Sequence, residues 1–372
     1  KSNQKRIDTM KINLILIFLV GLAVLFSAAP AFGLIGTLDP AFDGDGKVIT
    51  DVNSNTEAGN DVAVQSDGRI VVVGSTSGDF LTIRYNSDGS PDPSFGVSGV
   101  TGTVVTDLGV GYNDYARAVA IQPDGKIVVA GYVDNTPGLY DFAVARYNSD
   151  GTLDISFSQD AGYNRNDYAT DVAIDASGRI VVAGYIDNAG WFQVVLMRFD
   201  STGSPDTTFG TSGIVVTPPI DATDYAQALT IQPDGQIVVA GYTSLNGTPD
   251  FLVLRYNSSD GSLDSSFNGT GYSIVEFPDV GSVYDEAFGV TLQPDGKIVV
   301  AGTSFASPTA MSILRLNPDG SLFPVTAGRL SGYPTRRIWQ PREGMSSCSR
   351  TVRSLSAAGL TTAVTTKAMI PL

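Results

Sequence analysis

A ten-residue segment, Gln-Pro-Asp-Gly-Lys-Ile-Val-Val-Ala-Gly at residues 122–131, recurs along the chain with small changes. Two further blocks follow it in the same order: an apolar segment that ends in arginine, and Leu-Asp-x-x-Phe or Pro-Asp-x-x-Phe. A regular period of this length indicates an array of supersecondary units that bury their apolar faces against one another. The turn glycines lie about 57 residues apart on average, at Gly68, Gly125, Gly178, Gly235 and Gly296. The arginines are Arg84, Arg146, Arg198, Arg255 and Arg315.

Each period predicts four short strands. In the second repeat these are residues 104–106, 118–121, 126–130 and 142–147, which are rich in β-branched, alanine or aromatic side chains. Pro-Asp-Gly suits the tight turn before the third of these segments, because Pro presets φ and Gly accepts a positive φ. No stretch shows a sustained helical period with caps. The sequence therefore predicts an all-β fold, a β-propeller of four-stranded blades with five in-frame repeats. A β-helix is the alternative, but its coils are much shorter than this period.

The three motifs in this order resemble the delta-60 repeat family of predicted bacterial β-propellers, over about residues 38–322. The resemblance implies an extracytoplasmic bacterial protein. It implies no catalytic residues, because the family has no established activity to transfer.

Residues 1–31 have the pattern of a targeting segment. Met10-Lys11 precedes a run at 12–26 that is apolar except for Asn13, and Ala29-Pro30-Ala31 follows. A positive start, a short apolar run and a small-residue end are typical of a secretory signal peptide, which predicts cleavage after Ala31. Residues 1–9 then lie upstream of the start methionine. The run is short for a membrane-spanning helix, although an uncleaved anchor is the alternative. We therefore expect a secreted or extracytoplasmic protein, at the cell surface or in the periplasm, with no membrane span after cleavage.

Residues 32–322 form the predicted propeller domain, and residues 323–372 lose all repeat character. Phe323 stands where the repeat expects Asp. Reading Cys348–Leu360 through chosen synonymous codons in another frame yields Gln-Pro-Asp-Gly-Lys-Ile-Val-Val-Ser-Gly-Gly-Phe. Its turn glycine begins in the codon of Thr351, 55 residues after Gly296. We interpret the tail as an out-of-frame remnant of a sixth blade lost to a frameshift; a genuine disordered basic tail is the alternative.

The composition excludes several classes of function. The chain has no His and one Cys, which removes His-based catalysis, the commonest metal ligand and Cys-rich zinc sites. Residues 32–322 hold 36 acidic and 12 basic side chains, a net charge of −24. This acidity argues against nucleic acid as a partner, because such binding depends on Lys and Arg at phosphates. We find no catalytic constellation and no cofactor motif.

One acid precedes each turn glycine by eleven residues. In a propeller, equivalent positions form a ring, so we expect these carboxylates to face one common surface. Such a ring suits calcium or a cationic partner. The alternative, favoured because every repeat has the acid, is that each one caps a strand or bonds backbone. The acids are Glu57, Asp114, Asp167, Asp224 and Asp285.

The repeated arginines are predicted to be structural. Each of the first four has a plausible ion-pair partner in the acid of the following Asp-x-x-Phe block, which would fix the register between blades. Those acids are Asp92, Asp154, Asp206 and Asp264. Tyrosines follow the strand glycines at Tyr132, Tyr185 and Tyr242. They suit either a carbohydrate or protein surface, or packing between blades.

Three classes of function follow from these patterns. A secreted binding or adhesion module, with an unidentified protein or carbohydrate ligand, explains the symmetry and the lack of catalytic residues. A purely structural envelope scaffold explains them as well. The alternative is a propeller-fold hydrolase or lyase acting on extracellular polysaccharide, which would need a carboxylate pair at a position that breaks the symmetry.

Overall fold

The structure is a computed structural model that describes residues 38–322, apart from 53–55, 97–98, 109–112, 137, 160–165, 221–222, 246–247, 278–283 and 306–309. The described residues form strands and turns and no helix. None of them forms a helix that is long and apolar enough to cross a membrane. The predicted signal peptide and tail lie outside the described residues.

The strands form five separate sheets, which we call blades 1 to 5. Blade 1 contains β1 (Glu57–Val64), β2 (Ile70–Thr76), β3 (Asp79–Tyr85) and β4 (Thr103–Thr106). Blade 2 contains β5 (Asp114–Ile121), β6 (Ile127–Thr136), β7 (Leu139–Tyr147) and β8 (Leu153–Gln159). Blade 3 contains β9 (Asp167–Ile174), β10 (Ile180–Asn188), β11 (Trp191–Phe199) and β12 (Ile214–Val216). Blade 4 contains β13 (Asp224–Ile231), β14 (Ile237–Leu245), β15 (Thr248–Tyr256) and β16 (Tyr272–Val275). Blade 5 contains β17 (Asp285–Leu292), β18 (Ile298–Ser304) and β19 (Ala310–Leu316).

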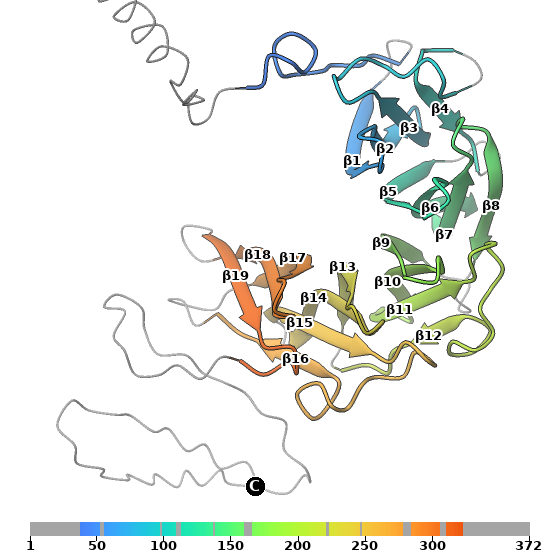
Figure 1. Ribbon diagram of the computed structural model, residues 1–372. Coiled ribbons are helices and arrows are strands. Elements are labelled where there is room, and N and C mark those ends of the chain that lie inside the picture. Colours follow the sequence, from blue (N-terminus) through green and yellow to red (C-terminus); the bar gives the residue numbers. More distant parts are fainter. Residues whose placement is uncertain are drawn as a thin grey trace, which may run out of the picture.

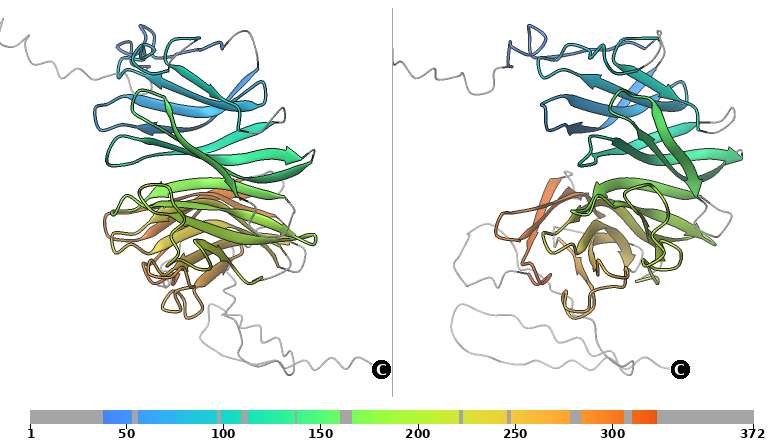
Figure 2. Two further views of the ribbon diagram at one scale, coloured as in Figure 1. Left: turned by 90° about the vertical axis from the view of Figure 1, so that its right-hand side faces the viewer. Right: turned by 45° about the vertical axis from the view of Figure 1, so that its right-hand side comes forward.

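Each blade is an antiparallel meander in sequence order, as the repeat predicts. The first strands β1, β5, β9, β13 and β17 lie on the inside of an arc, and the fourth strands lie on its outside (Figure 1). The sheets are stacked face to face along the arc (Figure 2). The all-β propeller architecture is therefore confirmed. Among the described residues blade 5 has three strands rather than four.

The core lies between neighbouring sheets rather than within any one of them. Phe142 and Val144 of blade 2 pack with Val182 and Met197 of blade 3 in one buried cluster. The next cluster joins blades 3 and 4, and a further one joins blades 4 and 5. Each blade therefore buries its apolar face only because another blade covers it, which is the property of repeat arrays.

Two glycines of the repeat are required by the backbone. The turn glycine Gly125 has φ near +86°, and its amide bonds to the carbonyl of Gln122 at 2.9 Å. Gly131 lies opposite a bulge in the first strand, where the register shifts between Ala116 and Ala118. A Cβ on Gly131 would lie 1.9 Å from the carbonyl oxygen of Tyr115, so any other residue would displace the strand. The motif ends in Ala-Gly for this reason.

Candidate functional site

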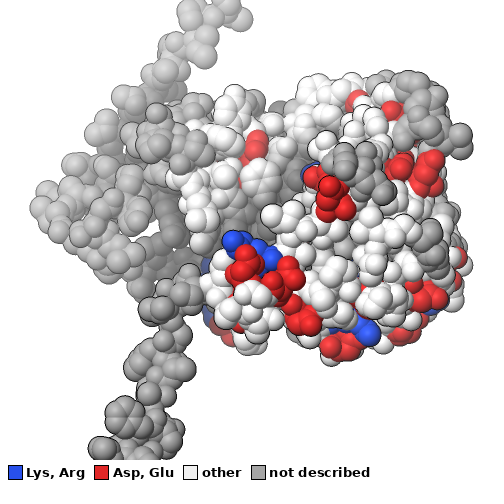
Figure 3. Space-filling model, turned by 90° about the horizontal axis from the view of Figure 1, so that it is seen from above, with Lys and Arg blue, Asp and Glu red and all other residues white. Residues whose placement is uncertain are grey.

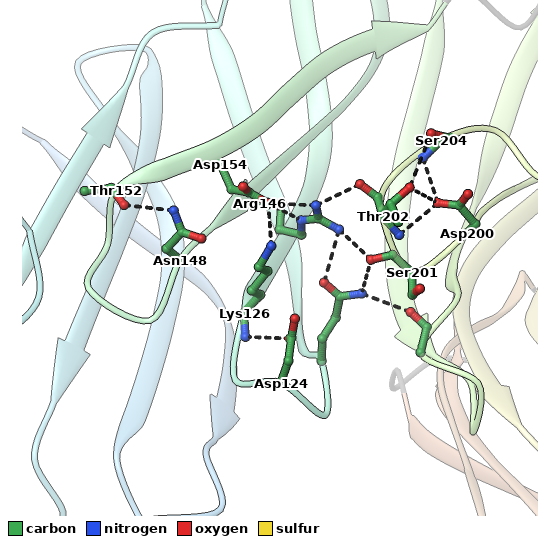
Figure 4. Close-up of polar contacts among 12 residues, drawn as sticks. Asp124, Lys126, Arg146, Asn148, Thr152, Asp154, Asp200, Ser201, Thr202 and Ser204 are labelled. Carbon is green, nitrogen blue, oxygen red and sulfur yellow. Dashed lines mark hydrogen bonds and ion pairs between the residues drawn. The ribbon is translucent and has the colours of Figure 1, made fainter.

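The arginine at the end of each third strand joins two blades. Arg146 reaches Asp154 in its own blade, with Nη2 2.7 Å from Oδ2. Its Nη1 donates to the carbonyl of Ser201 and its Nη2 to that of Thr202, both at 2.8 Å and both in the turn of blade 3 (Figure 4). The side chain is 5% exposed. Nearby, Gln122 donates from Nε2 to the carbonyl of Gly178 at 2.9 Å, a second contact between these blades.

The same bridge recurs in blades 1, 3 and 4. The arginine-to-aspartate distances are 2.8 Å for Arg84–Asp92, 2.9 Å for Arg198–Asp206 and 2.8 Å for Arg255–Asp264. In each blade Nη1 also donates to a turn carbonyl of the following blade, at Ser149, Ser258 and Pro318 respectively. The predicted ion pairs are therefore present. In blades 1, 3 and 4 the arginine pairs with Oδ2 of the aspartate, because Oδ1 accepts hydrogen bonds from the Ser or Thr two residues later.

The predicted acid ring is buried rather than exposed. Asp114, Asp167, Asp224 and Asp285 are all at most 1% exposed, which supports the favoured alternative of local backbone contacts over a ring of carboxylates on a common surface. Oδ2 of Asp114 accepts the amide of Leu108 at 2.6 Å, and Asp224 and Asp285 accept the equivalent amides of Ile220 and Phe277. The fifth member, Glu57, accepts a long hydrogen bond from Thr76. The contacts of Asp114, Asp224 and Asp285 fix the segments that enter blades 2, 4 and 5.

One member of the predicted ring, Asp114, lies beside two carboxylates that are not part of it. Asp79, Asp107 and Asp114 each offer an oxygen atom, and these atoms lie within 4.8 Å of one another. The pKa of Asp79 is raised by its partial burial and by the nearby charge of Asp107. Oxygen ligands of this kind suit Ca²⁺. Calcium binding stays a prediction, which the melting temperature of the protein in calcium and in chelator would test.

The tyrosines that follow the strand glycines belong to a continuous belt of aromatic rings, whose extent the sequence analysis did not predict. It runs across blades 2, 3 and 4, with neighbouring ring centroids 4.6 to 5.6 Å apart. The belt joins the tyrosines that follow the strand glycines with those that follow the acids, and a ring from each of two third strands completes it. Its members are Tyr115, Tyr132, Tyr140, Tyr168, Tyr185, Phe192, Tyr225 and Tyr242. The signal was available, because facing positions of the first and second strands both read Tyr in three consecutive repeats.

The belt is half-buried and has charged groups beside it. Burial raises the pKa of Tyr168 and that of Tyr225 to about 12, so their hydroxyls stay protonated as hydrogen-bond donors. Arg117 lies close enough to lower the pKa of Tyr132, while burial raises it more strongly. The belt therefore offers ring surface and hydroxyl groups together.

The belt breaks the symmetry of the repeat. The positions of Tyr225 and Tyr242 are occupied by Glu286 and Thr303 in blade 5, and by Ala58 and Ser75 in blade 1. The arginine and the entry acid, by contrast, recur in every repeat. Because folding contacts repeat while binding sites differ between units, the belt is the best candidate for a functional site.

Figure 3 shows one face of the molecule, on which acidic side chains outnumber basic ones.

Five antiparallel blades, a repeated bridge between them and a repeat period shared along the chain define a β-propeller repeat protein. The family model described as "Domain of unknown function (DUF5122) beta-propeller" matches residues 65–95, 122–157, 176–209, 232–267 and 293–322. The five matched segments fall one in each blade.

The chain is also similar to solved structures. One is a protein of unknown function from Dyadobacter fermentans DSM 18053, at 13% identity and a TM-score of 0.48, covering 72% of this chain and 81% of that one. A protein from Lactobacillus plantarum has 15% identity, a TM-score of 0.49 and coverage of 74% and 71%. An α-L-arabinofuranosidase from Clostridium thermocellum ATCC 27405 has 12% identity, a TM-score of 0.39 and coverage of 72% and 92%. No curated protein matches. Likeness at this level carries no information on ligand or activity.

Proposed function

We propose that this chain is a secreted, non-catalytic binding module of the delta-60 repeat kind, which binds an extracellular carbohydrate polymer along the aromatic belt. The observation that carries the proposal is the belt itself, because it crosses three blades and is absent from the same positions of the other two. Aromatic rings give flat apolar surface with polar edges, and tyrosine hydroxyls both donate and accept hydrogen bonds. Such a surface suits the mixed apolar and hydroxyl faces of a sugar.

The length of the belt favours an extended ligand over a small one. Ring contacts run without interruption from Tyr115 in blade 2 to Tyr242 in blade 4. Acidic groups lie near the belt: burial is the main cause of the raised pKa of Tyr168 and of Tyr225, and the charges of Asp187 and Glu286 respectively add to it. These acids would accept hydrogen bonds from sugar hydroxyls, and they disfavour polyanionic ligands.

Binding is tested with the signal-cleaved protein on a glycan array, followed by titration calorimetry with the polysaccharides that bind. Phe192→Ala and Tyr140→Ala should each weaken binding about tenfold, because each removes ring surface at the belt. Val105→Ala is the matched control, since Val105 is an exposed apolar residue on the outer strand of blade 1. Equal affinity of all three variants and the parent would exclude the belt as the binding surface.

Secretion is tested separately. Expression of the whole reading frame in a bacterial host, followed by cell fractionation and amino-terminal sequencing, should recover a protein that begins at Phe32 outside the cytoplasm. Recovery of an uncleaved chain in the membrane fraction would support the anchor alternative instead.

A second candidate, a polysaccharide hydrolase or lyase, is favoured by one observation. Asp250 is 9% exposed, and burial together with the charges of Glu276 and Asp285 raises its pKa to about 7. A carboxyl that holds its proton near neutral pH beside other carboxylates is the arrangement that general acid catalysis uses. Turnover of a bound polysaccharide that is lost in Asp250→Asn would establish this function. Binding without turnover would leave the module as the function.

A further inference from the structure

Arg117 in β5 is a basic side chain that the contacts of the repeat do not use. Apart from Arg117 and Arg315, every basic side chain in the described residues forms an ion pair with an aspartate. Arg315 bonds to Gln293 instead. Within the described residues, no hydrogen bond or ion pair joins Arg117 to another group, and its side chain is exposed. In so acidic a domain, a guanidinium without a partner in the protein is free to bind a ligand.

The residue occupies a β-bulge in the innermost strand of blade 2. The ladder between β5 and β6 passes from Ala116 to Ala118, which leaves Arg117 as the extra residue. A bulge re-aims the side chain that it carries and is common beside binding sites. Because β5 lies on the inside of the arc (Figure 1), the exposed side chain of Arg117 reaches solvent from the inner edge of the blade.

The bulge residues of blades 1 and 3 are held by the protein. Nδ2 of Asn60 donates to the carbonyl of Ala116 at 2.7 Å. Oγ1 of Thr170 lies 3.2 Å from the carbonyl oxygen of Ala226, to which it donates. Each of these contacts joins a bulge to the blade that follows. Among the described residues, Arg117 forms no such bond to blade 3.

The bulge residue of blade 4 shows what this position reaches. Gln227 forms a side-chain hydrogen bond with Tyr242, which belongs to the aromatic belt. The corresponding tyrosine in blade 2 is Tyr132. Burial raises the pKa of Tyr132 and of Tyr185, and the positive charge of Arg117 opposes the rise in both. The guanidinium of Arg117 therefore lies near two hydroxyls of the belt, in neighbouring blades.

The acids that follow the bulge in blades 1 and 3 are already engaged. Oδ2 of Asp61 accepts the amide of Val119 at 2.8 Å, and Oδ2 of Asp171 accepts that of Leu229 at 2.6 Å. Both contacts join the first strands of adjacent blades, so these carboxylates hold the array together. Within the described residues neither acid forms an ion pair with Arg117, whose charge is left for a ligand.

We propose that Arg117 binds the carboxylate of an acidic sugar, so that the belt selects a polysaccharide whose neutral chain carries separated uronic acid residues. A guanidinium presents a planar fork of donors that matches the two oxygen atoms of a carboxylate. The hydroxyls of Tyr132 and Tyr185 can donate to the same group. The inference rests on the proposed function, because the belt would bind the neutral part of the chain.

The surrounding charge explains why the carboxylates should be separated. Asp187 lies near Tyr168, and Glu286 lies near Tyr225. Because like charges repel, a polymer with a carboxylate on every residue would meet these acids along the belt. One carboxylate at Arg117, with neutral sugars over the remaining rings, avoids this repulsion.

The test compares two forms of one polymer by titration calorimetry with the signal-cleaved protein. Glucuronoxylan has a neutral xylan backbone that carries separated glucuronic acid residues, and reduction of its carboxyl groups yields an uncharged polymer of the same length. The parent protein should bind glucuronoxylan about tenfold more tightly than the reduced form, which is the size expected of one hydrogen-bonded charge pair. Polygalacturonate, with a carboxylate on every residue, should bind more weakly than glucuronoxylan. Tighter binding of polygalacturonate would overturn the requirement for separated carboxylates.

Arg117→Met removes the guanidinium and retains an exposed flexible side chain. Because Arg117 bonds to no described residue, this variant should fold like the parent, and it should bind both forms as weakly as the parent binds the reduced form. Lys47→Met is the matched control: Lys47 is an exposed base outside the belt, so this variant loses one charge but should keep the preference. Equal loss of preference in both variants would assign the effect to net charge and overturn the proposal.

Phe192→Ala distinguishes failure of this inference from failure of the proposed function. It should weaken binding of both forms alike, because it removes ring surface and no charge. If the parent binds both forms equally, or Arg117→Met keeps the preference, Arg117 has no role in recognition while the belt stands. The same holds if the parent binds neither form but binds other glycans on the array. If Phe192→Ala binds both forms as the parent does, or no glycan on the array binds, the proposed function fails and this inference with it.

Discussion

Blades 4 and 5 are built from the same repeat, yet the same positions are buried in one and exposed in the other. Phe251 and Val253 of β15 are fully buried, whereas Met311 and Ile313 of β19 are 81% and 63% exposed. Arg255 is buried between two blades, whereas Arg315 is exposed with Gln293 beside it. The comparison teaches that the repeat specifies the strands locally, while the neighbouring blade supplies the burial. Substitutions at matched positions should therefore have very different costs in the two blades.

The largest difference is expected at the bridging arginine. Arg198→Ala should lower the free energy of unfolding by about 3 kcal/mol, because it removes the closer of the two arginines that pair with Asp206 and a bond to blade 4. Arg315→Ala should change it by less than about 0.5 kcal/mol, as exposed substitutions usually do. Urea denaturation of the two variants measures both. Equal costs would show that the arginine acts within its own blade.

A difference of similar size is expected for apolar side chains. Phe251→Ala should cost about 3–5 kcal/mol, because it opens a cavity between blades 4 and 5. Met311→Ala, at the corresponding position of blade 5, should cost less than about 0.5 kcal/mol. Thermal melts followed by circular dichroism would report both changes.

The pH dependence of stability tests Asp250, whose position in blade 5 is occupied by Ala310. The folded-state pKa of Asp250, about 7, lies above its unfolded value, so the folded state retains a proton that the unfolded state loses. Stability from this group is present below about pH 4 and is lost as the pH rises through about 7. Asp250→Asn should therefore raise the melting temperature at pH 8 and leave it nearly unchanged at pH 4. An equal shift at both pH values would contradict this assignment.

The smallest effect should be the same inside the array and at its end. Oδ1 of Asp200 accepts the amide and hydroxyl of Thr202, and Asp319 does the same for Ser321. These local hydrogen bonds lower the pKa of both aspartates. Asp200→Ala and Asp319→Ala should each cost about 0.5–1.5 kcal/mol. A much larger cost at Asp200 would show that even the turns depend on their neighbours.

The fold followed from the sequence because its information is local and repeated. Turn glycines such as Gly125, arginines such as Arg146 and their aspartate partners recur at fixed spacing, so the ion pairs could be assigned before any contact was visible. The burial of Asp114 could not be predicted, because spacing places a carboxylate on a ring but does not show which segment covers it. Tyrosines of the aromatic belt were recognised in the sequence, but their arrangement as one continuous belt could not be predicted, for a related reason. Tyr132 and Tyr168 lie in different blades, and their contact depends on the angle between two sheets.

The bridge between blades has a direction. Blades 1 to 4 each hold an arginine that reaches forward, and blades 2 to 5 each hold a turn whose carbonyls receive the arginine of the blade before it. A duplication or loss of one whole repeat therefore preserves every contact between blades, since the arginine of any repeat can bond to the turn of any other. A break inside a repeat removes both an arginine that reaches the next blade and a turn that accepts the arginine of the blade before. Descendants of such a gene can change blade number freely by unequal recombination, while a small deletion that shifts the reading frame costs a blade and leaves the ring open.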